Sequence, residues 1–297
     1  MTLPVSDVIN VSISMATINS KASISPDGGD GAIVVGVSLH QIIKQMFASG
    51  EQGFFYDPND LTTMFQDAAG TVPVTAVGQP VGLILDKSGR GNHARQTTSA
   101  SRPILRKNAT TGAYYLEFDG TDDFLVTSSI NFTATDKISL FAGVRKLSDS
   151  ARGILFELGS AVGTLPGSFG IEAPRLNTAN AYSFVHQGST SPGTLATSGS
   201  LYSAPHSAVL VGNGSLSGTL SESIKVNSIT TVGPNTALGA NTKYGNYPLY
   251  IGRRAGTSLP FNGHIYGLIG IGKLTTDSET TTMEKELAKR VGVTLNV

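Results

Sequence analysis

The densest group of acidic residues lies in the segment 115–125, Y-L-E-F-D-G-T-D-D-F-L. On a β-strand Glu117 and Asp119 would share one face, because side chains alternate between the two faces of a sheet. Two carboxylates arranged in this way can act as the acid and the nucleophile of a retaining glycosidase. The same stretch carries a turn signal, because Asp119-Gly120 favours a hairpin and the side chains of Asp122 and Asp123 can bond the turn backbone.

The spacing of these acids resembles the E-x-D-x-x-E signature of the jelly-roll glucanases. In this chain the last acid is Asp122, and a turn at Gly120-Thr121 would take it off the strand face. A role as core residues and turn ligands accounts for more of the segment, with Leu116, Phe118 and Phe124 in the core. We therefore expect no catalytic residues and no enzymatic activity.

Hard cations such as calcium bind carboxylate and carbonyl oxygens. The sequence therefore offers one weak calcium candidate, formed by Asp119, Asp122 and Asp123. Apart from this candidate we expect no metal and no cofactor.

A second polar cluster, D-K-S-G-R-G-N-H-A, spans residues 86–94. It lacks the G-K-[ST] ending of a phosphate-binding loop, so a nucleotide site is not expected. The five histidines of the chain, His93 among them, show no metal-ligand spacing. We expect His93 to be packed and hydrogen-bonded.

Composition limits the class of protein and of partner. The 297 residues contain 21 Lys plus Arg and 21 Asp plus Glu, and a net charge of zero gives no field that would attract nucleic acid or an anionic membrane. The absence of Cys excludes disulfides and thiolate metal sites. No apolar run approaches the ~18 residues that a membrane-spanning helix needs, so we expect no membrane insertion. The N-terminus lacks the features of a secretory signal, so we expect synthesis in a cytoplasm without export by the Sec route.

Residues 1–31 are predicted to form an extended arm followed by a Gly-rich linker. Apolar residues partly alternate with polar ones in the arm, and Pro26-Asp27-Gly28-Gly29-Asp30-Gly31 then interrupts any regular structure. Such an arm would anchor the chain to an exposed sheet edge of a partner. The anchor residues that we assign are Val5, Val8, Ile9, Val11 and Ile13.

The segment 32–79 is predicted to contain one helix and a connecting segment. Leu39, Ile42, Ile43, Met46 and Phe47 recur at helical spacing, so we expect a short helix near 38–49. Its apolar face would pack on the domain that follows, or else contact a partner subunit.

Residues 80–297 are predicted to form one antiparallel β-sandwich. Short apolar runs alternate with turn residues, which is typical of a jelly roll, and no helical period recurs between them. Residues 187–200, rich in Gly, Ser and Thr, are expected to form an exposed loop. A capping box at Thr276-Asp277-Ser278-Glu279 begins a final helix near 276–291, with Glu284 on its solvated face. The expected strands lie at 81–85, 114–118, 124–127, 138–144, 153–158, 169–173, 182–186, 207–212, 221–227, 247–252 and 264–272.

Three of these segments together resemble the concanavalin A-like, laminin-G-like jelly rolls. They are D-x-S-G-x-G-N-H-A at 86–94, Y-L-E-F-D-G-x-D-D-F-L at 115–125, and Y-I-G-R at 250–253 followed by F-N-G-x-I-Y-G-L-I-G-I at 261–271. The resemblance covers residues 80–297 and implies two packed antiparallel sheets, often with sugar-binding or protein-binding loops at one rim. Because that family includes lectins, adhesive modules and glucanases, the fold does not select a function.

The segment 53–82 resembles a block that precedes such jelly rolls in virion proteins of tailed bacteriophages. In addition, M-T-L-P-V-S-D-V-I-N-V at 1–11 is similar to the N-terminal arm of phage tail sheath proteins. These resemblances imply a structural protein of the phage virion, attached to the tail through its arm.

The expected function is therefore the display of a jelly-roll domain on the tail, for recognition of a host-surface glycan or for decoration. The alternatives are a purely architectural tail, baseplate or collar component and, with less support, a polysaccharide depolymerase. The lack of Trp weakens the case for sugar binding, because sugars commonly stack on aromatic rings. Expected partners are other virion proteins and further copies of the chain in a symmetric assembly.

Overall fold

The computed structural model describes residues 39–162, 164–175, 180–187, 195–197, 202–217, 219–233, 236–237 and 242–296. The predicted arm and linker at 1–31, with the anchor residues Val5, Val8, Ile9, Val11 and Ile13, lie outside the described residues. Within the described part, no helix combines the length and the apolar character needed to cross a lipid bilayer.

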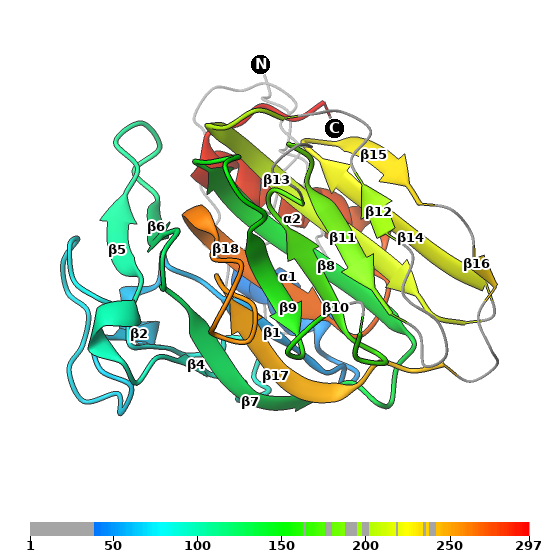
Figure 1. The fold of residues 1–297 in the computed structure, drawn as a ribbon, viewed down its shortest axis with the longest axis horizontal. Coiled ribbons are helices and arrows are strands. Elements are labelled where there is room, and N and C mark those ends of the chain that lie inside the picture. Colours follow the sequence, from blue (N-terminus) through cyan, green and yellow to red (C-terminus); the bar gives the residue numbers. More distant parts are fainter. Residues whose placement is uncertain are drawn as a thin grey trace, which may run out of the picture.

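The strands form two antiparallel sheets stacked in two layers (Figure 1). Sheet A has the order β15-β14-β13-β8-β18-β6-β5, with β1 also paired to β18 and β16 to β14. Its strands are β1 (Gly53–Tyr56), β5 (Ile104–Lys107), β6 (Tyr114–Asp119), β8 (Lys137–Lys146), β13 (His206–Ser215), β14 (Thr219–Val226), β15 (Ile229–Val232), β16 (Thr236–Ala237) and β18 (Asn262–Ile271).

Sheet B has the order β12-β11-β10-β9-β17-β7-β4-β3-β2. Its middle strands face the viewer in Figure 1. The expected loop at 187–200 contains one of its strands, β12. The strands of sheet B are β2 (Met64–Phe65), β3 (Leu83–Ile84), β4 (Ala94–Arg95), β7 (Leu125–Asn131), β9 (Ile154–Leu158), β10 (Phe169–Glu172), β11 (Ser183–His186), β12 (Leu195–Thr197) and β17 (Asn246–Ile251).

The two sheets enclose a continuous apolar core. Phe118 and Leu210 from sheet A and Phe156 and Phe184 from sheet B are fully buried in this core. Successive side chains of a strand point to opposite faces of its sheet, so every second residue of these strands lies between the layers. The prediction of an antiparallel sandwich is therefore confirmed.

The helices α1 (Leu39–Met46) and α2 (Asp277–Val291) pack on the outer face of sheet A. Both lie where the sequence predicted them. In α2 the Thr276 hydroxyl accepts from the Glu279 amide and the Glu279 carboxylate accepts from the Thr276 amide, which is the predicted capping box. The prediction that Glu284 lies on the solvated face of this helix was wrong. Its side chain is fully buried and pairs with Lys225 of β14 at 3.1 Å.

The sandwich includes the segment that precedes residue 80. Gly53–Tyr56 pairs with the central strand β18, from Gly53 opposite Ile271 to Tyr56 opposite Leu268. Met64–Phe65 extends sheet B beside β3. The expected boundary at residue 80 therefore falls inside the two sheets, which begin at Gly53.

The cluster at 86–94 is a structural turn that fastens β1 to the sandwich. The Asp86 carboxylate accepts four hydrogen bonds, from the amides of Phe55, Ser88 and Asn92 and from the Ser88 hydroxyl, at 2.7 to 3.0 Å. The Asp86 amide in turn donates to His93 Nδ1 at 2.9 Å. The two oxygens of a carboxylate can accept this many hydrogen bonds. The structure of the turn therefore explains the residue types and spacing of the cluster at 86–94.

Replacement of Asp86 should be strongly destabilising, because it leaves buried amides without an acceptor. We expect Asp86→Ala to lower the free energy of unfolding by about 3 kcal/mol. Asp86→Asn, which keeps one acceptor oxygen, should cost about half as much. Urea denaturation measures both, with Glu286→Ala as a control, because Glu286 pairs only with the exposed Lys289 among the described residues. Equal stability of Asp86→Ala and the control would contradict this role.

Candidate functional site

The acidic turn at 119–123 connects the two sheets at one rim of the sandwich. It joins β6 of sheet A to β7 of sheet B, so the predicted hairpin at Asp119-Gly120 is wrong. Gly120 adopts φ +77°, and a Cβ on it would lie 2.7 Å from the Cβ of Asn262. Glycine is required here by the backbone conformation and by the close approach of β18.

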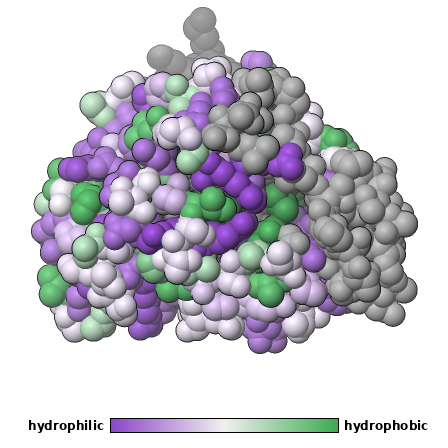
Figure 2. All heavy atoms as spheres, in the orientation of Figure 1, coloured by the Kyte–Doolittle hydropathy of each residue, from purple (hydrophilic) through white to green (hydrophobic). Residues whose placement is uncertain are grey.

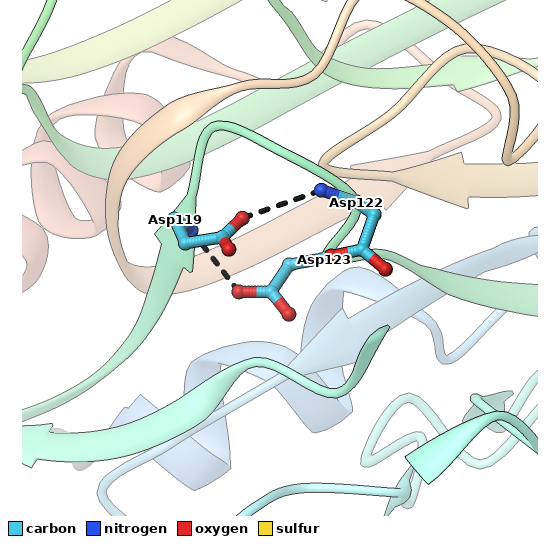
Figure 3. A group of neighbouring side chains, drawn as sticks. All are labelled: Asp119, Asp122 and Asp123. Carbon is cyan, nitrogen blue, oxygen red and sulfur yellow. Dashed lines mark hydrogen bonds between the residues drawn. The ribbon is translucent and has the colours of Figure 1, made fainter. Parts of the chain in front are cut away.

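Hydrogen bonds within the turn account for the closeness of its three carboxylates, which offer ligand atoms within 4.8 Å of one another. Asp119 Oδ1 accepts from the amides of Thr121 and Asp122, and Asp123 Oδ2 accepts from the Asp119 amide at 3.0 Å (Figure 3). Asp122 Oδ2 accepts from the Ser101 hydroxyl at 2.7 Å. The calcium candidate is thus a compact group of oxygens, and its occupancy stays a prediction.

Asp123 is the buried member of this group, with 6% of its surface exposed. Burial raises the pKa of Asp123 to about 6, and the neighbouring charges of Asp119, Asp122 and Glu117 add to this effect. The hydrogen bond from the Asp119 amide acts in the opposite direction but does not offset them.

Glu117 and Asp119 are both on the outward side of β6, as predicted from their spacing. Glu117 forms an ion pair with Arg106 of β5 at 3.2 Å, while Asp119 is held by the turn amides. Asp122 has left the strand, also as predicted. The three acids that resemble the glucanase signature therefore do not align along one strand.

A shallow cleft of about 60 Å³ lies beside the acidic turn, and we call it the rim cleft. Four connections of the same rim form it: the β6–β7 turn, the β8–β9 loop, the segment after β10, and the β17–β18 loop with the start of β18. Ser148, Ser150 and Asn262 contribute its polar side chains. Its full lining is Gly120, Ser148, Ser150, Ala151, Gly153, Ala173, Pro174, Pro260 and Asn262.

A buried lysine fixes the β8–β9 wall of the rim cleft. The Lys146 ammonium is fully buried and pairs with Asp149 at 2.5 Å. It also donates to the carbonyl oxygens of Asn180 at 2.8 Å and Tyr202 at 2.6 Å. All three donors are therefore used, which a buried ammonium requires. Burial lowers the pKa of Lys146, while Asp149 acts against this shift.

Two buried arginine–glutamate pairs hold neighbouring loops against the outer face of sheet B. Arg254, in the β17–β18 loop, donates from Nε to both oxygens of Glu157 on β9 at 3.1 Å. Arg152, in the β8–β9 loop, pairs through two nitrogens with Glu172 on β10. Burial raises the pKa of Glu157, although the positive charge of Arg254 opposes this. These bidentate pairs give the rim loops fixed positions.

The sequence analysis did not identify Lys146, Glu157 or Glu172, nor the polar residues of the cleft. The available signal was a single charge within an apolar strand, as in I-L-F-E-L at 154–158 and F-G-I-E at 169–172. A charge in such a position is buried and needs a partner, but its partner is distant in sequence.

No family model matches the chain, and a search of curated proteins finds no match. Among solved structures, an arabinofuranosidase complexed with arabinofuranosyl-alpha-1,2-xylobiose is 11% identical with a TM-score of 0.50, covering 84% of this chain and 65% of that one. Trypanosoma rangeli sialidase with the inhibitor DANA is 13% identical with a TM-score of 0.47, and the match covers 82% of this chain and 38% of that one. The binding domain of botulinum neurotoxin DC in complex with SialylT is 12% identical with a TM-score of 0.48, and the match covers 78% of this chain and 52% of that one.

The chain spans less than two thirds of the length of each of these structures. At such identities the similarity establishes the fold alone. It also contradicts one expectation from the sequence, the absence of enzymatic activity, because the fold is shared with an arabinofuranosidase.

The raised pKa of Asp123 predicts a specific dependence of stability on pH. Because the pKa in the folded state is about 6, above the ordinary 3.8, the folded state favours the protonated carboxyl. The stability from Asp123 is therefore complete below about pH 4 and is lost as pH rises through about 6.

Asp123→Asn imitates the protonated form and can still accept from the Asp119 amide. We expect it to be more stable than the wild type at pH 7.5, by on the order of 1 kcal/mol, and to show no advantage at pH 4. Urea denaturation at the two pH values measures this. Asp123→Ala is the control, because it removes the acceptor and should be destabilised at both. An advantage of Asp123→Asn that is equal at both pH values would contradict the assignment.

Proposed function

We propose that this chain is a glycan-recognition protein of a tailed-phage virion, and that its jelly roll binds a host-surface sugar in the rim cleft. The observation that carries the proposal is the cleft itself, which is concave, lined by hydroxyl and amide groups, and fixed by buried ion pairs. Sugars are recognised by such convergent hydrogen-bonding groups on a rigid support.

The size of the cleft limits the ligand. With a volume of about 60 Å³ the cleft is shallow, so we infer that it takes part of one sugar unit of a larger glycan. Ser148 and Ser150 present paired hydroxyls, with their oxygens 2.8 Å apart. Asn262 adds a carboxamide. This carboxamide and the serine hydroxyls are the groups that we assign to the sugar.

The face of sheet B that the viewer sees is not a conventional protein interface. Figure 2 shows strongly hydrophilic residues across its middle with hydrophobic ones scattered among them, and no broad apolar patch is seen among the coloured atoms. Large exposed apolar patches mark protein–protein interfaces, so this face is better suited to a polar ligand.

The virion assignment rests on the sequence resemblances of residues 1–11 and 53–82. A single small cleft binds weakly, because its hydrogen bonds replace hydrogen bonds to water. Attachment of many copies through the arm would present many clefts to one surface, and linked sites gain avidity by a factor of 10² to 10⁴. Copies in a symmetric assembly and other tail proteins are therefore the proposed partners.

Substitution of Asn262 should weaken sugar binding without affecting the fold. We expect Asn262→Ala to lower the affinity for glycans selected from an array of host-surface polysaccharides by about tenfold, the effect of one lost hydrogen bond to a ligand. Calorimetry on the selected glycan measures the loss. Asn296→Ala, an exposed asparagine near the C-terminus, is the matched control.

Two other results would redirect the proposal. If the wild type binds no glycan on the array, glycan recognition fails and an architectural role gains support. If the bound glycan is instead cleaved, new reducing ends appear over time, and their loss in a variant of the cleft would indicate a depolymerase rather than a binding protein.

The arm should be dispensable for folding and necessary for assembly. We expect deletion of residues 1–25 to change the free energy of unfolding by less than about 0.5 kcal/mol, because the described core contacts begin at the helix α1. Incorporation into particles should be lost. The full-length variant Val8→Asp/Val11→Asp is a matched control that should also fail to incorporate. A truncated chain that does not fold, or that still incorporates normally, would contradict the anchor.

A further inference from the structure

The outer face of sheet A is only partly covered by the helices. Residues of α1 and α2 pack over β1, β8, β13 and β18 at one end of the sheet. At the other end, next to the rim, the outward side chains of three strands form a short row. Glu117 of β6 lies opposite His264 of β18, and His264 lies opposite Arg145 of β8.

Arg145 stands out in this row because no residue in the described part of the chain pairs with its guanidinium. Its Nε is buried without a hydrogen bond, and no described residue forms an ion pair with it. The arginines of the rim loops have partners: Arg152 and Arg254 are each paired with a glutamate, and Arg253 donates to the carbonyl oxygens of Asp122 and Thr257. A partly buried guanidinium retains its charge, so it gains strongly from any carboxylate that reaches it.

The charges around Arg145 leave it available to an anion. The carboxylate of Glu117 is paired with Arg106 at 3.2 Å, so it is already matched. His264 is neutral at pH 7, since burial and the nearby charges of Arg145 and Arg106 lower its pKa to about 4, against the opposite effect of Glu117. The row therefore carries an excess of one positive charge.

An aromatic stack gives the row a fixed shape. The rings of Tyr115 and His264 are stacked with their centroids 4.1 Å apart, and Tyr115 also contacts Tyr266 at 5.0 Å. The hydroxyl of Tyr266 accepts a hydrogen bond from Asn108 at 3.1 Å. Arg145 is thus placed beside rigid rings, with little conformational entropy for the neighbouring surface to lose on binding.

The row continues directly into the rim cleft. Asn262, which lines the cleft, and His264 are two residues apart on β18 and share its outward face. Two residues of a strand span about 7 Å, which is comparable to one sugar unit. A glycan with one unit in the cleft can therefore place the next unit over His264 and Arg145.

We infer that Arg145 recognises the carboxylate of an acidic sugar, so that the glycan bound by this chain carries a uronic acid or a sialic acid next to the unit in the cleft. This inference rests on the proposed function and specifies its ligand class. An acidic segment of a partner protein is the competing occupant. The polar rim cleft next to Arg145 favours the glycan, because a sugar chain can bind the cleft through its hydroxyl groups and Arg145 through its carboxylate.

The test compares acidic oligosaccharides with neutral forms of the same compounds. The probes are oligosaccharides containing uronic acid or ending in sialic acid, each paired with its carboxyl-reduced counterpart. We expect the wild type to bind at least one acidic probe ten or more times more tightly than its reduced form. Arg145→Gln should abolish this preference and leave the affinity for the reduced probe unchanged. Arg145→Lys keeps the positive charge and should therefore show part of the wild-type preference. Arg95→Gln is the control for an exposed arginine.

The outcomes separate this inference from the proposed function. Equal affinity of the wild type for acidic and reduced probes would overturn the role of Arg145 and leave glycan recognition intact. A preference that persists in Arg145→Gln would also overturn it. Binding of a poly-glutamate peptide with no binding of any glycan would overturn both and indicate an acidic protein partner. Thermal melting of each variant checks that the fold is retained, and Arg145→Lys serves if Arg145→Gln is unstable.

Discussion

The burial of two apolar sheet faces against each other is the constraint on which the rest of this structure depends. Without disulfides, the sandwich gains its stability from side chains such as Phe118, Phe156 and Phe184, which are enclosed between the layers. The other side chains of each strand then point away from this core, and each connection between sheets must cross a rim. The acidic turn, the cleft and the row beside it all lie at such crossings or directly next to them.

A connection that crosses the rim brings backbone N–H and C=O groups close to the core. In this chain buried charged side chains form hydrogen bonds to these groups. Lys146 supplies three donors to loop acceptors, and Asp86 supplies acceptors to four donors of another turn. Arginine–glutamate pairs through Glu157 and Glu172 add fixed points on sheet B. Buried ion pairs contribute little net stability, but they specify one arrangement, because breaking one leaves a buried charge without a partner. That property suits loops that form a binding surface.

Much of the fold could be predicted from the sequence because its long strands have strong local signals. The strands β8 and β18 have ten residues each and contain the apolar runs L-F-A-G-V at 140–144 and I-Y-G-L-I-G-I at 265–271, and the capping box of α2 is a local motif. The strand β3 lies within the apolar run at 81–85 that predicted it, whereas β2 and β4 have two residues each and exist only because neighbouring strands pair with them, so no local pattern reports these two. The sequence indicated the turn at 119–123 but not that it connects two sheets, because turn chemistry is the same in both cases.

The candidate site was less predictable for a related reason. Gly120, Ser150, Pro174 and Asn262 are far apart in the sequence and become neighbours only through the order of the strands β6, β18 and β8 in sheet A and the crossings to sheet B. None of these residue types indicates a site by itself. The acidic cluster had the opposite property: it was conspicuous in the sequence, and its hydrogen bonds serve the turn.

The contrast between Arg145 and the other rim arginines indicates how function is distributed over this surface. Arg152 and Arg254 lie in the loops and are fully committed to glutamates, so their charge fixes the shape of the rim. Arg145 lies on a strand, where the sheet already fixes the backbone, and its charge is not needed for structure. A charge that is held in place by the sheet and has no structural partner can be used for binding at little cost to folding. Under the proposed function, the loops supply shape and the strand supplies charge, and a glycan that spans both parts is extended and negatively charged.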